Sequence, residues 1–194
     1  VKLSNLIKSL DEESIEGSIG IGHTRWATHG VPSETNAHPH SSPLVSIVHN
    51  GIIENASDLK KEVEDSDYSF ISETDSEVIT ALLTSYLNQK VNHVDAVKKM
   101  VSKLKGSYAL AILFNDLKDT IVGVKNESPL VVGYGKSGYS IGSDSIALSS
   151  IANKVCYLQP NIPLVWLPIL MVPNTALVNQ KIQPLRINWD NADS

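Results

Sequence analysis

The sequence predicts an α+β fold in which helices pack on antiparallel β-sheet, and two observations support this expectation. Between residues 57 and 104, apolar side chains recur at the three- and four-residue spacing of amphipathic helices. After Gly106 the pattern changes to short apolar runs separated by glycines and polar turns, which is typical of consecutive antiparallel strands. A length of 194 residues, with 42% hydrophobic and 19% charged residues, indicates one globular domain and excludes a disordered or collagen-like chain.

The first part of the chain is expected to hold a helix, a strand and a long loop. Apolar residues at helical spacing precede Gly17, which predicts a short helix that ends there. Alternation over 18–25 predicts a strand, whereas residues 26–43 carry Pro, Ser, Asn, Gly and His without periodicity. Such a segment indicates a long ordered loop, and loops of this length are usually functional.

One strand and three helices are expected next. The apolar run over 44–49 predicts a strand that ends at an Asn-Gly pair. A short helix is expected after Ser57, and Thr74 or Asp75 can cap a longer helix with a continuous apolar face. The same spacing predicts a further helix over 94–104.

Four antiparallel strands are expected after these helices. They are the runs SYALAILFN, DTIVGVK, PLVVGYG and GYSIGSD. Because residues 109–114 are apolar at nearly every position, both faces of this sheet must be covered, and we expect helices to pack on it. Five of the nine prolines lie between Pro160 and Pro184, and proline confines strands to sheet edges, so we expect poor regularity there.

Charge and cysteine content exclude several classes of protein. A formal charge of -5 leaves no basic surface for nucleic-acid phosphates, so we expect no nucleic-acid partner. The longest apolar run, 164–172, is too short to span a bilayer and contains Pro168, so we expect no membrane partner. The start of the chain lacks the layout of a signal peptide, and the single Cys156 suits a reducing compartment, so we expect a cytoplasmic protein.

Histidines are concentrated in one short window, which is the strongest compositional signal in the chain. Five of the six lie within 27 residues, at positions His23, His29, His38, His40 and His49. Any one of them can be a structural histidine with satisfied hydrogen bonds. The HPH pair could offer two metal ligands, but without a CxxC or HExxH pattern this is a weak signal, and we expect no metal and no organic cofactor.

Other nucleophilic chemistry has little support in the sequence. The chain contains no G-x-S-x-G pattern, which argues against a serine hydrolase of the nucleophile-elbow type. Cys156 stands between Val155 and Tyr157, and these neighbours favour a buried structural cysteine over a reactive thiol.

Three positions near the histidines each allow two interpretations. Arg25 follows the expected strand over 18–25 and could hold a carboxylate in bidentate fashion, or form an ordinary ion pair. Asn50 and Gly51 could form a hairpin turn, or an oxyanion hole from an amide side chain and a backbone N–H. Asp75 could be a helix cap, or could bind a substrate ammonium group.

Four ordered motifs carry a family resemblance. They are GHTRWATHG at 22–30, SETNAHPH at 33–40, VHNGIIEN at 48–55 and SETDSEVI at 72–79. Together they resemble the glutaminase domain of the glucosamine-6-phosphate synthases, a class II glutamine amidotransferase domain, over roughly residues 18–148. Other class II amidotransferases, such as amidophosphoribosyltransferase, share the HNG and Asp-Ser-Glu patterns, but NAHPH and HTRWATHG favour the synthases.

The resemblance implies a fold and a domain organisation. It implies an N-terminal-nucleophile (Ntn) hydrolase fold, an αββα sandwich of antiparallel sheets, here incomplete at the N-terminus. Residues 1–185 would form a partial glutamine amidotransferase type 2 domain, and residues 186–194 would begin the linker to sugar isomerase domains that are not in the sequence.

The resemblance also implies the site residues. Arg25 would hold the α-carboxylate of glutamine, Asp75 its α-ammonium group, and Asn50 with the N–H of Gly51 the tetrahedral oxyanion. The remaining implied residues are Trp26, Thr28 and His29 in substrate binding, and His38 and His49 in the pocket scaffold.

The resemblance finally implies an activity and a departure from it. The family enzyme hydrolyses L-glutamine with an N-terminal cysteine and passes ammonia to fructose 6-phosphate, as a homodimeric aminotransferase of amino-sugar biosynthesis. Here position 1 is Val1, and the resemblance implies that roughly 50 residues with the nucleophile are missing. We therefore expect these 194 residues alone to be inactive, and the alternative is a nucleophile-free domain that binds glutamine or regulates.

Overall fold

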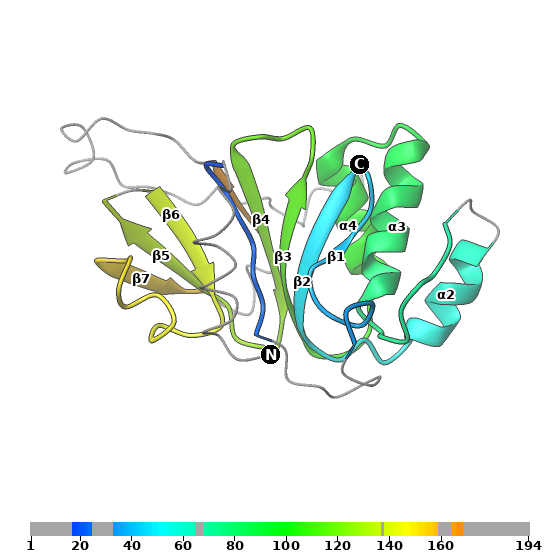
Figure 1. The fold of residues 1–194 in the computed structure, drawn as a ribbon, viewed down its shortest axis with the longest axis horizontal. Helices are drawn as coiled ribbons and strands as arrows, with labels where there is room; N and C mark the ends of the chain where they lie inside the picture. Colours follow the sequence, from blue (N-terminus) through cyan, green and yellow to red (C-terminus); the bar gives the residue numbers. More distant parts are fainter. Residues whose placement is uncertain (1–16, 25–32, 65–67, 137, 159–163, 169–194) are drawn as a thin grey trace, which may run out of the picture.

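The computed structural model describes residues 17–24, 33–64, 68–136, 138–158 and 164–168 (Figure 1). The described elements are β1 (His40–Ser41), β2 (Val45–Gly51), α2 (Ala56–Glu64), α3 (Glu77–Asn88), α4 (His93–Lys103), β3 (Tyr108–Phe114), β4 (Thr120–Asn126), β5 (Val131–Gly135), β6 (Gly138–Gly142), β7 (Lys154–Tyr157) and β8 (Leu164–Pro168). They form two sheets and one layer of helices, as Figure 1 shows from the three-stranded sheet on the left to the helices on the right.

Every strand pairing in the described chain is antiparallel. The larger sheet has the order β1-β2-β3-β4-β8, and the smaller one has the order β6-β5-β7. In the centre of the larger sheet, β2 and β3 pair along their whole length, from Val45 opposite Phe114 to Gly51 opposite Tyr108. The strands expected after Gly106 are thus confirmed, and the alternation of their side chains assigns each residue to one face of the sheet.

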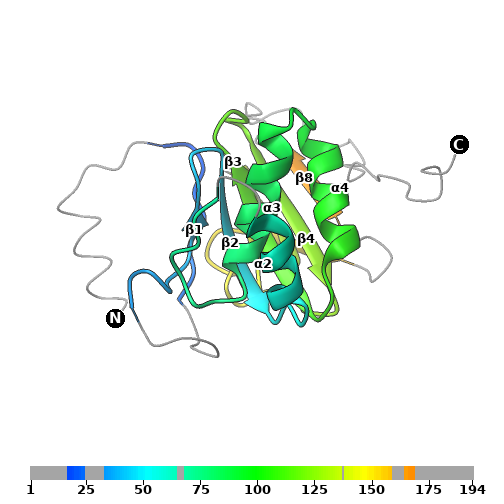
Figure 2. The ribbon, with the colours of Figure 1, turned by 90° about the vertical axis from the view of Figure 1, so that its right-hand side faces the viewer.

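Three helices cover one face of the larger sheet (Figure 2). The apolar faces of α3 and α4 pack on β2, β3 and β4, and Leu59 and Val63 of α2 extend the same core. The side chains of Val45, Ile47 and Ile112 are fully buried on this face. The amphipathic spacing read from the sequence therefore gives the correct helices and the correct inward face.

The smaller sheet covers the other face of the larger one. Ala109, Ala111 and Ile121 form a second core with Val132 of the smaller sheet and with Leu130, which directly precedes β5. The prediction that both faces of β3 are covered is confirmed, but the second cover is β-sheet and not helix. A continuous apolar run indicates that both faces of a strand are buried and does not indicate which element covers each face.

Several local expectations differ from the structure. Asn50 and Gly51 are the last residues of β2 rather than a two-residue turn, and residues 18–24 pair with no described strand. The N-cap position of α3 is Ser76, without a side-chain capping bond, so neither Thr74 nor Asp75 caps it. Cys156 lies in β7 but is exposed, so the expectation of a buried cysteine is wrong: β7 is an edge strand of the smaller sheet, and all four of its residues are exposed.

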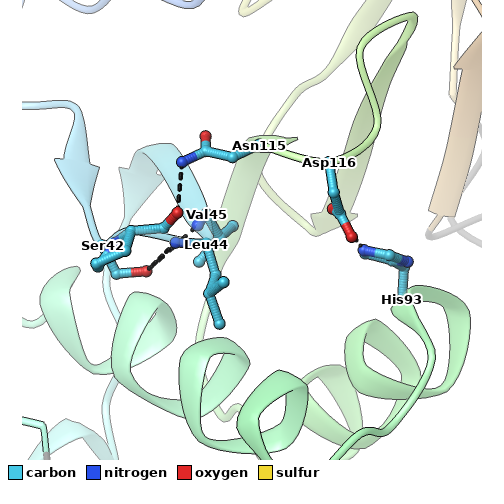
Figure 3. A network of polar contacts seen from close by, with 7 residues as sticks. Ser42, Leu44, Val45, His93, Asn115 and Asp116 are labelled. Carbon is cyan, nitrogen blue, oxygen red and sulfur yellow. Dashed lines mark hydrogen bonds and ion pairs between the residues drawn. The ribbon is translucent and has the colours of Figure 1, made fainter.

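Polar contacts hold the start of β2, the end of the strand that is remote from Asn50 (Figure 3). Asn115 Nδ2 donates to the carbonyl of Pro43 at 2.6 Å, and the hydroxyl of Ser42 accepts from the N–H of Leu44. On the same turn as Asn115, Asp116 pairs with His93 of α4 at 2.9 Å. These contacts fix the start of β2 and leave its end to be held by other groups.

The proline-rich tail contributes one described strand. β8 pairs with β4, with Pro168 opposite Thr120, and it is the edge strand of the larger sheet. An edge position is where a strand tolerates a residue that has no N–H to donate. No helix in the described part of the chain is long and apolar enough to cross a membrane.

Candidate active site

The end of β2 sends neighbouring side chains to opposite faces of the sheet. His49 is on the helix-covered face, with Val45 and Ile47, and Asn50 is on the face that meets the smaller sheet. His49 is only 4% exposed, whereas Asn50 is exposed. Polar groups from three other segments gather around these two residues: His23, the loop that holds His38, and the turn before α3.

The hydroxyl of Ser76 links two imidazoles. Its Oγ lies 2.8 Å from His49 Nδ1 and 3.1 Å from His38 Nε2, and Ser76 is itself 3% exposed. A hydroxyl can donate only one hydrogen bond, so at least one of the two imidazole nitrogens is the donor. Thr74, two residues earlier, lies 2.9 Å from His40 Nε2, so the turn before α3 holds three of the clustered histidines.

Burial keeps His49 neutral at ordinary pH. Desolvation is the largest effect and lowers the pKa of His49 to about 4; the Asp75 carboxylate opposes it, while His23 and His40 add to it. The Nε2 atom of His49 is buried and makes no hydrogen bond with the described residues. This agrees with the assignment of His49 to the scaffold of the site rather than to proton transfer, although the structure does not test that role.

His23 reaches Asn50 across the open face of β2. Its Nε2 lies 2.7 Å from Asn50 Oδ1. The His23 ring also lies against the His38 ring, with centroids 4.3 Å apart and planes inclined by 37°. Sequence reasoning gave His23 no role, although it belongs to the histidine cluster and to the GHTRWATHG motif.

The backbone N–H of Gly51 points away from β3. Ile52 donates to the carbonyl of Ser107 at 2.8 Å, and residues facing a partner alternate along an antiparallel ladder, so Gly51 faces the opposite side. On that side β1 pairs only with Ser46 and Ile47, and no described strand reaches Gly51. Gly51 has φ +119°, and an added Cβ would lie 2.0 Å from the Ser107 carbonyl oxygen, so only glycine fits here.

Asp75 ties the turn before α3 to the chain just after β2. Its Oδ2 accepts from the N–H of Ile53 at 2.7 Å, and the side chain is half-buried. Within the described residues, Oδ1 receives no hydrogen bond, so this carboxylate keeps acceptor capacity for a cation. The structure thus brings Asp75 to the same end of β2 as Asn50 and Gly51.

Two buried polar residues that sequence reasoning missed hold the loop before Asp75. Glu77 is 2% exposed and accepts from the N–H groups of Ile71 at 3.0 Å and Ser72 at 2.7 Å. Asn36, also 2% exposed, accepts from the N–H of Glu73 at 2.9 Å and donates to its carboxylate at 3.3 Å. Asn36 lies inside the motif SETNAHPH and Glu77 inside SETDSEVI, so a sequence signal existed. An amide or carboxylate side chain does not by itself indicate a buried structural role.

A cavity adjoins the Asn50 side of the site. Its volume is about 320 Å³, and it lies between the two sheets. Val48, one pleat from Asn50, and Gly22, next to His23, are among the lining residues, which are mostly apolar. Asn50, His23 and Asp75 are not among the described lining residues, so the cavity lies beside the polar groups, on the face of β2 that carries Asn50.

Four of the residues assigned to substrate binding lie outside the described part of the chain: Arg25, Trp26, Thr28 and His29. His38, His49, Asn50, Gly51 and Asp75 are described, and the contacts above bring them together. No group of three or more His, Cys, Asp or Glu side chains in the described segments is arranged to hold a metal ion. Cys156 belongs to the smaller sheet, where its Sγ lies 3.8 Å from the carbonyl oxygen of Tyr157.

A family model and individual relatives both relate this sequence to glutamine amidotransferases. A model of the glutamine amidotransferase domain family matches residues 23–150. The glutamine–fructose-6-phosphate aminotransferase (isomerizing) of Mesorhizobium japonicum is 50% identical over 158 residues, and that of Gluconobacter oxydans is 48% identical over the same length. These alignments cover 81% of this chain but only 26% of each relative, so the chain spans about a quarter of their length.

Comparison with solved structures gives the same fold. The glutamine phosphoribosylpyrophosphate amidotransferase of B. subtilis superposes with a TM-score of 0.57 at 24% identity, over 75% of this chain and 32% of that one. A glutamine aminotransferase class-II domain protein from Silicibacter pomeroyi gives 0.51 at 16% identity, over 69% and 66%. At these identities the likeness concerns the fold alone, which supports the α+β, Ntn hydrolase assignment.

Proposed function

Because this chain belongs to the glutamine amidotransferase domain family, we propose that its protein hydrolyses L-glutamine at the end of β2 and passes the ammonia to fructose 6-phosphate. The name of the Mesorhizobium relative gives glutamine and fructose 6-phosphate as its reactants, and the family resemblance implies that the product is glucosamine 6-phosphate. The observation that carries the proposal is the meeting of the Asn50 amide, the outward N–H of Gly51 and the Asp75 carboxylate at one end of one strand.

Asp75 is proposed to bind the α-ammonium group of glutamine. Its Oδ2 is held by the N–H of Ile53, which fixes the carboxylate while Oδ1 retains acceptor capacity. The α-carboxylate would be bound by Arg25, with Thr28, His29 and Trp26 completing the pocket; these four roles follow from the family resemblance.

Asn50 and Gly51 are proposed to stabilise the oxyanion. When a thiolate attacks the side-chain amide carbon of glutamine, the carbonyl oxygen becomes negatively charged, and the Asn50 amide and the Gly51 N–H can donate to it. Collapse of this intermediate breaks the C–N bond and releases ammonia, which leaves a γ-glutamyl thioester. Water then cleaves the thioester to glutamate and regenerates the thiol.

Cys156 does not suit the role of that thiol. It is exposed in β7 of the smaller sheet, whereas the site is built on β2 of the larger one (Figure 1). The proposal therefore takes its nucleophile from a cysteine outside the 194 residues. The position of Cys156 equally favours a second candidate, a domain that binds glutamine without hydrolysing it.

The test is an assay of the complete polypeptide that carries this chain, with glutamine and fructose 6-phosphate. We expect glutamate and glucosamine 6-phosphate in equal amounts. Asn50→Ala should lower kcat by roughly 10²–10³-fold because an oxyanion donor is lost. Asp75→Asn should chiefly raise the KM for glutamine, because binding of the ammonium group is common to ground and transition states.

A matched control is Asp116→Asn, which removes an exposed carboxylate at the remote end of the sheet and should change neither constant. Binding of glutamine without release of glutamate by the complete polypeptide would favour the second candidate. If the complete polypeptide neither binds nor hydrolyses glutamine, both candidate functions are overturned.

A further inference from the structure

The two ends of the Asn50 amide have opposite hydrogen-bonding character, and only one suits an oxyanion. The Nδ2 group donates two hydrogen bonds, whereas Oδ1 only accepts and would repel a developing negative charge. Catalysis therefore depends on which end of the amide faces the substrate. Within the described residues, the hydrogen bond of this side chain is the 2.7 Å contact between Oδ1 and His23 Nε2.

His23 is itself held by the cluster that places the other site residues. Its ring packs on the His38 ring at 4.3 Å, and His38 Nε2 lies 3.1 Å from the hydroxyl of Ser76. The same hydroxyl lies 2.8 Å from His49 Nδ1, and His49 is the chain neighbour of Asn50. The same cluster of polar residues therefore contacts the Asn50 side chain through His23 and holds the Asn50 backbone through its neighbour His49.

We propose that His23 is a positioning residue for glutamine hydrolysis: its Nε2–H donates to Asn50 Oδ1 and so turns the Nδ2 hydrogens toward the oxyanion. This inference rests on the proposed function. If Nε2 carried no proton, it would accept from Asn50 Nδ2 instead, and the amide would present its carbonyl oxygen to the site. The protonated nitrogen of His23 therefore selects the productive orientation of Asn50.

The kinetic test compares two substitutions in the complete polypeptide. His23→Phe keeps a flat ring beside His38 but removes the donor, and His23→Gln replaces it with an amide donor of similar reach. We expect His23→Phe to lower kcat roughly 10²-fold with the KM for glutamine changed less than about threefold, because the lost effect acts on the transition state. His23→Gln should recover most of kcat.

The control is His93→Phe, because His93 also bonds through Nε2, to Asp116, but at the remote end of the sheet (Figure 3). It should leave kcat unchanged. The inference is overturned if His23→Phe keeps wild-type kcat, if only KM changes, or if His23→Gln is as slow as His23→Phe.

A spectroscopic measurement separates this inference from the proposed function. Long-range ¹H–¹⁵N correlation spectra of the 194-residue chain report which imidazole nitrogen of His23 is protonated. A protonated Nε2 supports the inference, and a neutral ring protonated at Nδ1 alone overturns it. If the unsubstituted polypeptide releases no glutamate, the proposed function fails, and the spectrum still decides how His23 and Asn50 are paired.

Discussion

His49 and Asn50 show how a strand divides two tasks between adjacent residues. The pleat of β2 places His49 among the buried groups under α3, where the Ser76 hydroxyl lies 2.8 Å away. It places Asn50 on the open face, where His23 lies 2.7 Å from its Oδ1. A buried residue of the predicted scaffold and an exposed residue proposed to meet substrate are thus joined by one peptide bond.

The depressed pKa of His49 predicts a specific loss of stability in acid. The imidazole has a pKa of about 4 in the folded chain and 6.5 as its ordinary value. Between these values the unfolded state binds a proton that the folded state does not, so the free energy of unfolding falls as pH falls from 6.5 to 4. The difference corresponds to about 3 kcal/mol, complete near pH 4 and absent above pH 6.5.

The measurement is urea unfolding between pH 4 and pH 7. His49→Asn introduces an amide that can reach Ser76 but cannot be protonated. The free energy of unfolding of this variant should therefore depend on pH less steeply, with about one proton fewer taken up on unfolding. Asn115→Ala, which removes a hydrogen bond at the remote end of the sheet but no titratable group, is the control and should keep the slope of the unsubstituted chain. Equal slopes for all three proteins would show that His49 is not the titrating group.

At the scale of elements, the site depends on how the chain enters α3. The N-cap residue Ser76 gives its hydroxyl to two imidazoles and not to the helix. Asp75 bonds Ile53, and Glu77 in the first turn reaches back to the N–H groups of Ile71 and Ser72. Three successive side chains therefore join the helix start to three different parts of the site.

We predict that Glu77→Gln destabilises the chain by about 2 kcal/mol, because the amide can accept from only one of the two N–H groups and places a donor against the other. Chemical denaturation gives the value. Glu62→Gln is the matched control, because Glu62 pairs with Lys103 at the surface and its loss should cost less than about 1 kcal/mol. Equal losses would show that the buried carboxylate contributes no more than a surface pair.

The elements themselves were largely predictable from the sequence. Helices α3 and α4 follow from apolar residues at helical spacing, since each has one buried face, and strands β3 to β6 follow from short apolar runs separated by glycines and turns. The region of residues 18–24 was misjudged because alternation alone does not supply a pairing partner. Cys156 was expected to be buried because its neighbours are Val155 and Tyr157. Such neighbours indicate a strand, but they do not indicate whether either face of that strand is covered, and Cys156 is exposed.

The candidate site was predictable by resemblance and only partly by chemistry. Asn50 and Asp75 had two interpretations each; the structure excludes the turn at Asn50 and the helix cap at Asp75, and the two binding roles stay predictions. Ser76 and His23 were missed because their contacts are long-range, across 27 residues for both His49–Ser76 and His23–Asn50. No local pattern encodes a hydrogen bond between segments that meet only in the fold.

At the scale of the whole molecule, the larger sheet is packed differently on its two faces. The helix-covered face is closely filled, with Ala81 of α3 fully buried. The face toward the smaller sheet contains the cavity of about 320 Å³, which Ala111 and Val48 line. The described part of the sandwich is thus tight under the helices and open between the sheets, on the side where Asn50 is exposed.

This asymmetry predicts opposite outcomes for the same enlargement of two alanines. Ala111→Val adds two methyl groups toward the cavity in a strand that favours β-branched residues, so the free energy of unfolding should change by less than about 0.5 kcal/mol. Ala81→Val adds the same groups to a filled core and should cost about 1–3 kcal/mol.

Urea denaturation of both variants at pH 7 measures the difference. Part of the Ala81→Val loss comes from helix propensity, up to about 0.7 kcal/mol, so a difference above that value is required. Losses of equal size would show that the space between the sheets closes in solution. A loss confined to Ala81→Val would show that the cavity persists beside Asn50, where a proposed glutamine site needs room for its substrate.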